Sequence, residues 1–401
     1  MESESVVKVL RAIPELEEIR EVWESWPGNR DSEMESYLTF LRTHPGAVRP
    51  HVLVVYRQAR PDAILVGRID DGQIRYRLGY LGMCSKARIM CFVYGALRGN
   101  PSKANCELLV NEILRSLSLG EADVAYLNFL RKGSDLCRLA TKKPALLCRD
   151  YIRTAQPHFT AALPATPEEF YRGLSPKVRK NQKWQAKKLV SHFSGAVRIR
   201  CFREVAELDQ MIQDVEHIAK RSYQRGLGVG FVDSPATREG LRLKAEKGWL
   251  RGHVLYLAER PCAFWLGDVN RTTLGSDYVG YDSEFASHSP GMYLFMKVIE
   301  GLCNGNSEGV TEIDFATGYA QYKEVLSNRK WEEESVYIFA PSIKGISLNL
   351  IRSLVCGIDL ALKKVLARTN LLQRIKKKWR ARAIPQEAAQ GHERDGSLRS
   401  N

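Results

Sequence analysis

The sequence predicts a mixed α/β protein with mixed sheets, built from two related lobes and followed by an amphipathic C-terminal helix. An order of strand, loop, helix and strand occurs twice at nearly equal spacing, which is typical of an internal duplication. The helices of the two copies, 107–117 and 292–302, align without gaps. Their apolar residues fall in register at Leu109/Leu294, Val110/Phe295, Ile113/Val298, Leu114/Ile299 and Leu117/Leu302. Chance similarity of two amphipathic helices is the alternative explanation.

Each copy also begins with two short apolar segments separated by polar residues, the pattern of adjacent strands. These pairs are 52–56 with 63–68, and 253–258 with 262–267 across a turn at 259–261. Strand ends are predicted at 77–82 and 277–280, later strands at 124–129 and 311–315, helices at 15–26 and 32–41, and a linker at 156–167. We therefore expect lobes over 1–160 and 161–341, a basic amphipathic helix over 342–384 and a disordered tail over 385–401.

The net charge of +14 is unevenly distributed. Segment 171–203 has ten Lys or Arg and no acid, and segment 341–384 has eleven against the single acid Asp359, so the remainder is about −6. This distribution argues against a uniformly basic nucleic-acid-binding surface. The nine cysteines include no C-x-x-C pair, which favours reduced thiols and no metal site. With an acidic N-terminus and no run of roughly 18 apolar residues, we expect a cytoplasmic chain without a spanning helix.

The most informative segment runs from the strand end at 280–282 to Ser289, Pro290, Gly291 and Met292, where a helix begins. A helix start has unpaired N–H groups and a partial positive charge, and glycine allows close approach to the backbone. We expect these four residues to bind the pyrophosphate of a cofactor, with acetyl-CoA or a longer acyl-CoA as the donor substrate. The first copy has no glycine at 104–106, so the second lobe is the one expected to be active.

Residues 168–340 resemble GNAT-superfamily acyltransferases of the CelD-like branch, which is associated with bacterial envelope polysaccharide synthesis and related to Fem-type aminoacyl transferases. The resemblance rests on segments 174–181, 263–267, 278–282, 289–291 and 313–323. It implies two tandem GNAT-like lobes and transfer of an acyl group to an amine or hydroxyl. The usual phosphate loop ends in a small residue, whereas this chain has Tyr293 there.

Direct attack on a thioester needs a base, a proton donor and oxyanion stabilisation, and no covalent intermediate. Asp282, His288, Asp314 and Tyr322 are the candidate catalytic residues. The alternatives are a turn-forming Asp282, a solvent-facing His288, an ion-paired Asp314 and a core-packed Tyr322. The GNAT resemblance implies that Tyr322 protonates the departing thiolate.

A basic helix at 175–190, with Ser175 as its N-cap, provides the candidate substrate-binding residues. They are Lys180, Lys183, Trp184 and Lys187, together with Lys323 after the last predicted strand. A solvated charged face is the alternative interpretation. The helix at 342–384 is expected to pack with its first half and to contact a membrane or a synthase through residues 346–382.

These observations lead to one preferred function and two alternatives. We expect an acyl-CoA-dependent N- or O-acyltransferase acting on a sugar or a polysaccharide-related acceptor. A Fem-type aminoacyl-tRNA-dependent transferase is less favoured, because only two segments are basic. A non-catalytic scaffold recruited to a membrane is the third hypothesis.

Overall fold

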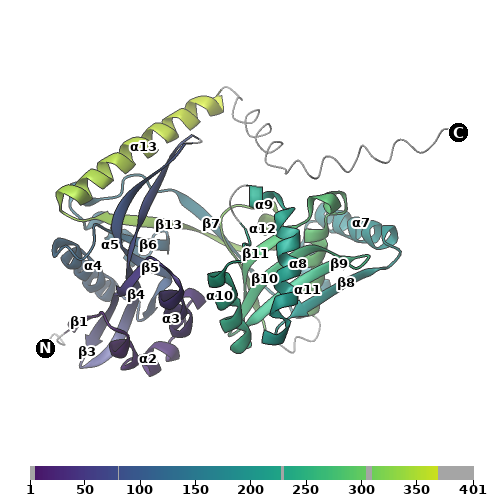
Figure 1. The fold of residues 1–401 in the computed structure, drawn as a ribbon, viewed down its shortest axis with the longest axis horizontal. Helices are drawn as coiled ribbons and strands as arrows, with labels where there is room; N and C mark the ends of the chain where they lie inside the picture. Colours follow the sequence, from purple (N-terminus) through teal and green to yellow (C-terminus); the bar gives the residue numbers. More distant parts are fainter. Residues whose placement is uncertain (1–4, 80, 227–229, 304–308, 369–401) are drawn as a thin grey trace. The chain divides into compact units, whose positions relative to one another are not determined.

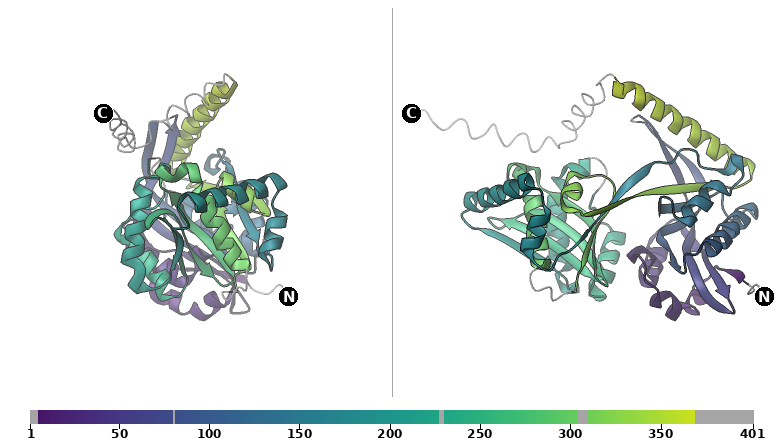
Figure 2. Two further views of the ribbon diagram at one scale, coloured as in Figure 1. Left: turned by 90° about the vertical axis from the view of Figure 1, so that its right-hand side faces the viewer. Right: turned by 180° about the vertical axis from the view of Figure 1, so that it is seen from behind.

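The computed structural model describes residues 5–79, 81–226, 230–303 and 309–368. They form two compact units. Unit 1 combines the chain up to Pro157 with the segment that begins at Trp331, and unit 2 is His158–Lys330. Figures 1 and 2 show the mixed sheet and helices of each unit.

Unit 1 is built on strands that run in the order β1-β3-β4-β5-β6-β13, with β2 paired to β4. Their bounds are β1 Ser5–Leu10, β2 Ala47–Pro50, β3 Val52–Arg57, β4 Arg60–Leu78, β5 Leu81–Gly99, β6 Val124–Arg131 and β13 Arg329–Phe339. The helices are α1 Ile13–Glu17, α2 Arg20–Ser25, η1 Arg30–Ser32, α3 Met34–Thr43, α4 Lys103–Ser118, α5 Asp135–Lys142, η2 Leu146–Cys148 and α13 Ile343–Arg368.

Unit 2 has strands in the order β7-β12-β11-β10-β9-β8. Their bounds are β7 Ala155–Ala162, β8 Val197–Phe202, β9 Leu250–Leu257, β10 Arg260–Asn270, β11 Thr273–Tyr281 and β12 Glu312–Thr317. The helices are α6 Pro167–Gly173, α7 Pro176–His192, η3 Val205–Glu207, α8 Leu208–Lys220, α9 Tyr223–Gly226, α10 Pro235–Glu246, η4 Ser283–His288, α11 Pro290–Cys303 and α12 Gln321–Leu326.

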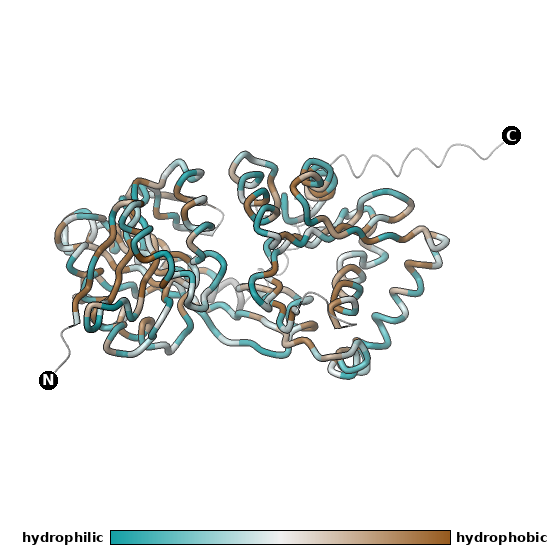
Figure 3. The backbone as a smooth tube through the Cα atoms, turned by 90° about the horizontal axis from the view of Figure 1, so that it is seen from below, coloured by the Kyte–Doolittle hydropathy of each residue, from teal (hydrophilic) through white to brown (hydrophobic). Residues whose placement is uncertain are grey.

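Alternate residues of β9 and β10 fill two hydrophobic clusters in unit 2. Leu255 and Trp265 pack with α11, whereas Val254 and Leu266 pack with α8. Because successive side chains of a strand point to opposite faces, both faces of this sheet are covered. In Figure 3 the hydrophobic residues concentrate along the strands inside each unit.

The same motif occurs in both units. In unit 1 the antiparallel strands β3, β4 and β5 are followed by α4 and by β6, which is parallel to β5. In unit 2, β9, β10 and β11 are followed by α11 and by β12, which is parallel to β11. The predicted fold class, two related α/β lobes with a C-terminal helix, is confirmed.

Several predicted elements differ from the structure. The expected strand end at 77–82 is the tip of a long hairpin, since Leu78 pairs with Leu81. The expected helix at 15–26 is split into α1 and α2, and β7 occupies most of the expected linker at 156–167. The turn in the second copy lies at Ala258 and Glu259, both with positive φ.

The units also divide the chain differently from the predicted boundaries at 160 and 341. Residues 331–339 of β13 belong to unit 1, where they pair with β6. This pairing joins segments about 200 residues apart, which local sequence patterns do not reveal. Helix α13 belongs to unit 1 as well, and the expected tail at 385–401 lies outside the described residues.

One helix bears on the expectation about spanning segments. Residues Ile343–Lys363 of α13 are long and apolar enough to cross a membrane, judged by length and composition alone. Charged residues interrupt the apolar run of this segment, so it does not contain the uninterrupted run of roughly 18 apolar residues typical of a spanning helix.

Candidate active site

The start of α11 is set by a tight connection from the end of β11. Asp282 caps the short helix η4 through a 3.0 Å hydrogen bond from the Glu284 N–H to its Oδ1. Ser289 follows in the left-handed region, with φ of 51°, and turns the chain into α11 at Pro290. The first N–H groups of a helix have no acceptor within the helix. Those at the start of α11 are therefore available to a ligand at this turn.

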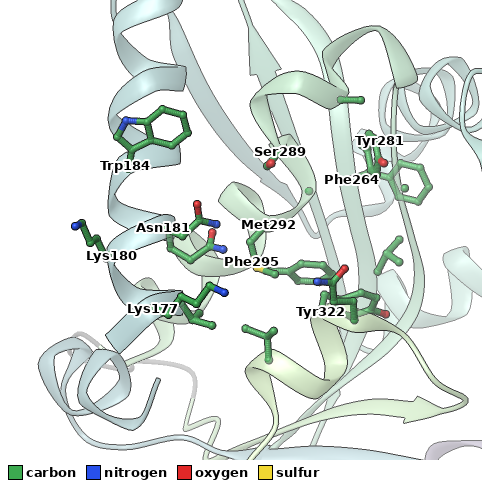
Figure 4. Close-up of a pocket in the computed structure, with 18 of the residues that line it drawn as sticks. Lys177, Lys180, Asn181, Trp184, Phe264, Tyr281, Ser289, Met292, Phe295 and Tyr322 are labelled. Atoms are coloured by element: carbon green, nitrogen blue, oxygen red, sulfur yellow. The ribbon is translucent and has the colours of Figure 1, made fainter. Parts of the chain in front are cut away.

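A cavity of about 740 Å³ opens at this helix start. It lies between α7, β11, α11 and α12, all within unit 2 (Figure 4). Parallel pairing of β11 with β12 covers Thr273–Gly275 and Glu312–Asp314, and the later part of β11 borders the cavity instead. The lining includes Lys177, Lys180, Asn181, Trp184, Gln224, Phe264, Gly280, Tyr281, Ser289, Gly291, Met292, Phe295, Gln321 and Tyr322.

The lining has a positive charge. Lys177 and Lys180 of α7 contribute to the lining, and the described residues that line it include no Asp, Glu or His. Figure 4 shows Lys177 and Asn181 facing Phe295 and Tyr322 across the cavity, whereas the Lys180 side chain points to the outer side of α7. Together with the helix start, the Lys177 ammonium group inside the cavity and the nearby charge of Lys180 favour an anionic ligand.

Two glycines shape the cavity in different ways. A Cβ at Gly280 would lie 2.6 Å from the ring of Phe264, so this glycine lets that ring pack against β11. A Cβ at Gly291 would meet only Tyr281 Cδ1, at 3.5 Å, which is an ordinary contact. The fold therefore tolerates a methyl group at Gly291, and the space there is available to a ligand.

One buried acceptor in the cavity wall has no hydrogen-bond partner among the described residues. Gln224 donates from Nε2 to the carbonyl of Val279 at 3.4 Å, whereas its Oε1 is left unpaired. A buried acceptor without a partner costs free energy, and a ligand N–H would satisfy it. The helix start thus offers backbone donors to an anion, and this amide oxygen offers an acceptor to an N–H group.

A second cavity of about 610 Å³ lies between α6, α7 and α11 and shares Gln182 and Ser289 with the first. Lys183 and Tyr293 line it. Tyr293, which stands where the usual phosphate loop has a small residue, therefore lines the second cavity and not the first. Burial raises the pKa of the Tyr293 phenol.

The structure brings only some of the predicted catalytic residues to the cavity. Tyr322 lines it and stacks on Phe295, with ring centroids 4.7 Å apart. Asp282 is buried behind the turn, where its Oδ2 lies 3.8 Å from Arg221 Nε. His288 packs against His192, and burial and this neighbour lower its pKa.

Asp314 and Lys323 belong to a polar group at the end of β12. Asp314 Oδ1 lies 2.7 Å from His158 Nε2, and Lys323 donates to the carbonyls of Ala316 and Thr317 at 3.1 and 3.0 Å. Burial lowers the pKa of Lys323 to about 8, against the opposing effect of Asp314. Neither residue lines the cavities beside α11.

The predicted substrate-binding residues of α7 also separate. Lys180 and Trp184 line the first cavity and Lys183 the second, whereas Lys187 lines neither. Ser175 caps the helix as expected, since its Oγ accepts from the Val178 N–H. Of the predicted cofactor-binding residues, Ser289, Gly291 and Met292 line the first cavity, and Pro290 is buried.

Sequence reasoning missed Gln224, Tyr281, Phe264 and Gln321. Gln224 comes from α9, which packs next to α8 and has no recognisable motif. Tyr281 and Phe264 were within segments quoted for the resemblance, yet only the strand pairing shows that they meet at the cavity.

The corresponding helix start in unit 1 is closed. Ser102 caps α4 by accepting from the Asn105 N–H, and the Asn105 side chain donates to Asp62 Oδ2 at 2.7 Å. Arg57 in turn donates to Asn105 Oδ1 at 2.8 Å. Cys106, at the position that aligns with Gly291, is 1% exposed. Protein groups thus occupy the place that is open in unit 2.

Comparison with known proteins finds one family that matches the segment around the first cavity. Residues 176–324 match the model of the family described as an acetyltransferase (GNAT) domain. The part of unit 2 from α7 through the cavity to α12 is therefore similar to a GNAT-type acetyltransferase domain. No curated protein matches the chain.

Among solved structures, FemX has a TM-score of 0.52 at 12% identity, over 84% of this chain and 98% of its own. A tandem GNAT protein from the clavulanic acid biosynthesis pathway has a TM-score of 0.47 at 10% identity, over 84% and 99%. The C-terminal domain of a putative lysylphosphatidylglycerol synthetase from Agrobacterium fabrum has 0.45 at 10% identity, over 76% and 88%. The FemX likeness shows the fold alone.

Proposed function

We propose that unit 2 is an acyl-CoA-dependent acyltransferase that transfers its acyl group to an amine or hydroxyl of a sugar or a polysaccharide-related acceptor. The observation that supports it most is the open start of α11 beside a cationic cavity, in contrast to the closed start of α4. The sugar acceptor and the CelD-like branch are supported by the set of sequence motifs in 168–340.

In this proposal the α11 start, through Ser289, Gly291 and Met292, binds the pyrophosphate. Lys177 and Lys180 neutralise further anionic groups of the ligand. Gln224 Oε1 accepts a hydrogen bond from an amide of the pantetheine arm. When bound, the cofactor supplies the activated acyl thioester.

We assign Tyr322 as the proton donor to the departing thiolate. The described lining residues include no carboxylate or imidazole, and of their two tyrosines, Tyr281 and Tyr322, the sequence resemblance points to Tyr322. Asp282, His288 and Asp314 lie outside this lining. In the proposal Asp282 positions the turn before α11, His288 positions the aromatic residues next to that turn, and Asp314 positions the end of β12.

Calorimetric titration with acetyl-CoA and with longer acyl-CoA tests the donor. We expect binding by the wild type and retained binding by Gly291→Ala, since the added methyl group makes only an ordinary contact. Gly291→Glu should weaken binding by about a hundredfold or more, because it places a carboxylate at the phosphate position. If no acyl-CoA binds the wild type, the cofactor assignment is wrong.

The Fem-type alternative is supported by one observation on α7. Within the described residues, its lysines form no ion pair with an acidic side chain, and Trp184 is 57% exposed. This surface fits a polyanion. Steeply salt-dependent binding of aminoacyl-tRNA, without competition by acyl-CoA, would favour this alternative. Catalytic turnover with either donor would exclude the non-catalytic scaffold.

A further inference from the structure

Helix α13 has one face packed on unit 1. Leu348, Val355 and Cys356 join a hydrophobic cluster with Ile74 and Tyr76 of the β4–β5 hairpin. Figures 1 and 2 show the helix running beside this hairpin. These apolar contacts join α13 to a part of the chain about 280 residues earlier, so α13 is an integral element of unit 1.

Polar residues of the packed face hold the helix in place. Asn349 donates to the carbonyls of Leu147 and Arg149, each at 2.8 Å. Arg352 forms a buried ion pair with Asp150. Moving α13 across a bilayer would separate this ion pair and leave both charges in hydrocarbon, which is costly. Although α13 is apolar enough to span, the structure therefore favours a helix that stays on the protein.

The opposite face of α13 is apolar and exposed. Six residues lie within an arc of about 120° at roughly 100° per residue, and we call them the α13 stripe. They are Ile343 at 90% exposure, Leu350 at 59%, Ile351 at 45%, Leu354 at 65%, Ile358 at 44% and Leu362 at 46%. Lys344 and Ser347 lie in the same arc beside Ile343, and from Leu350 to Leu362 the exposed residues of the arc are apolar. Scattered exposed apolar residues are common, but a stripe of this length indicates an interaction surface.

The tip of the β4–β5 hairpin is a second exposed apolar part of unit 1. The Gly79 N–H donates to Asp359 Oδ1 of α13 at 2.8 Å, which brings the tip next to the helix. Leu81 at the tip is 69% exposed and Met83 is 38% exposed. The tip therefore adds exposed apolar residues to unit 1 near the C-terminal part of α13.

The charges around the stripe identify its partner. The acid in α13, Asp359, is paired with Lys363 at 2.5 Å and bonded to Gly79, so it is neutralised within unit 1. The sequence from Lys363 to Arg382 continues with Lys and Arg and has no acid. An apolar stripe next to a strongly cationic segment is the pattern of helices that lie on anionic membranes.

We propose that unit 1 docks on the surface of an anionic lipid bilayer through the α13 stripe and the hairpin tip, with α13 parallel to the membrane plane. Two copies of this chain would bring two cationic segments together, so charge repulsion disfavours a dimer through the same face. The site in unit 2 would then act at a membrane surface.

Flotation with lipid vesicles tests this proposal on the full chain. We expect binding to phosphatidylcholine vesicles with about 30 mol% phosphatidylglycerol to exceed binding to phosphatidylcholine alone by about tenfold or more, and to fall when salt rises from about 0.1 to about 0.5 M. Leu354→Glu with Ile358→Glu, or Leu81→Glu alone, should reduce binding by about tenfold or more, because carboxylates would enter the apolar contact.

Leu360→Glu is the matched control, since Leu360 is 40% exposed on the same helix but lies off the stripe. It should bind vesicles like the wild type, and thermal unfolding and acetyl-CoA titration should be unchanged in all variants. Absence of wild-type binding to anionic vesicles would overturn the proposal. So would equal losses with Leu360→Glu, or a stable dimer in light scattering that Leu354→Glu dissociates.

Discussion

His158 and Asp314 form a partly buried pair between neighbouring antiparallel strands of unit 2, with His158 Nε2 2.7 Å from Asp314 Oδ1. The histidine is 1% exposed, and its Nδ1 lies 3.2 Å from Thr317 Oγ1. Asp314 Oδ1 also accepts from the Ala316 N–H at 2.7 Å, where the backbone has φ of 62°. The pair thus holds the end of β12 in a conformation that is unusual for alanine.

Asp314→Asn should lower the free energy of unfolding by about 1–3 kcal/mol, because it weakens the hydrogen bond to a buried partner. Urea unfolding of this variant, of His158→Gln and of the double variant gives the coupling between the two side chains. We expect the Kd for acyl-CoA to stay within about twofold of the wild type, since Asp314 does not line the cavity. Loss of turnover at unchanged stability would instead place the carboxylate in the chemistry.

The pH dependence of stability should reveal Lys323. Its pKa is lowered by burial to about 8 in the folded protein, below the ordinary value of 10.5 for a lysine. Between these values the unfolded state binds more protons, so the free energy of unfolding should rise with pH over this window. Lys323→Met should flatten this rise in urea titrations from pH 7 to about 10.5. A parallel slope in the variant would show that another group is responsible.

Tyr322→Phe removes the phenol that we assign to protonating the thiolate. We expect kcat to fall by about 10²–10⁴, with the Kd for acyl-CoA little changed, because the ring still stacks on Phe295. Tyr293→Phe is the control, since that phenol lines the second cavity. Equal rates for wild type and Tyr322→Phe would remove Tyr322 from the chemistry.

Lys177 and Lys180, which line the first cavity, should increase the affinity for the acyl-CoA donor, whereas Lys187 of the same helix should not. Lys177→Glu with Lys180→Glu should weaken acyl-CoA binding by about tenfold or more and reduce its salt dependence. Lys187→Glu should leave binding nearly unchanged, because Lys187 lines neither cavity. A comparable loss in Lys187→Glu would point to the overall field of α7 rather than to local contacts.

Much of the site could be predicted because it follows from short segments. The Ser289 to Met292 turn, the N-cap at Ser175 and the alternation in β9 and β10 depend on residues a few positions apart. The internal duplication was visible for a related reason, since helices 107–117 and 292–302 keep equivalent apolar positions. Their ends differ, with Cys106 aligned to Gly291.

What was missed depends on contacts between distant segments. Gln224 of α9 lines the first cavity. Tyr293 lines a second cavity, which no local sequence pattern predicted. Asp282 and Asp314 looked available for catalysis because both follow or lie in strands near the helix start. Asp282 is instead buried beside Arg221, and Asp314 is bonded to His158, so neither carboxylate lines the first cavity.

The sequence by itself determined the two-lobe α/β plan, the turn into α11 at Ser289 to Met292 and the cationic α7, because periodicity, capping and glycine placement act locally. Only the tertiary structure decided which side chains meet at the cavity, which charges are buried and that β13 joins unit 1. It also decided which face of α13 stays exposed. Burial and long-range pairing arise when distant segments pack, and that packing sets the environment of each chemical group.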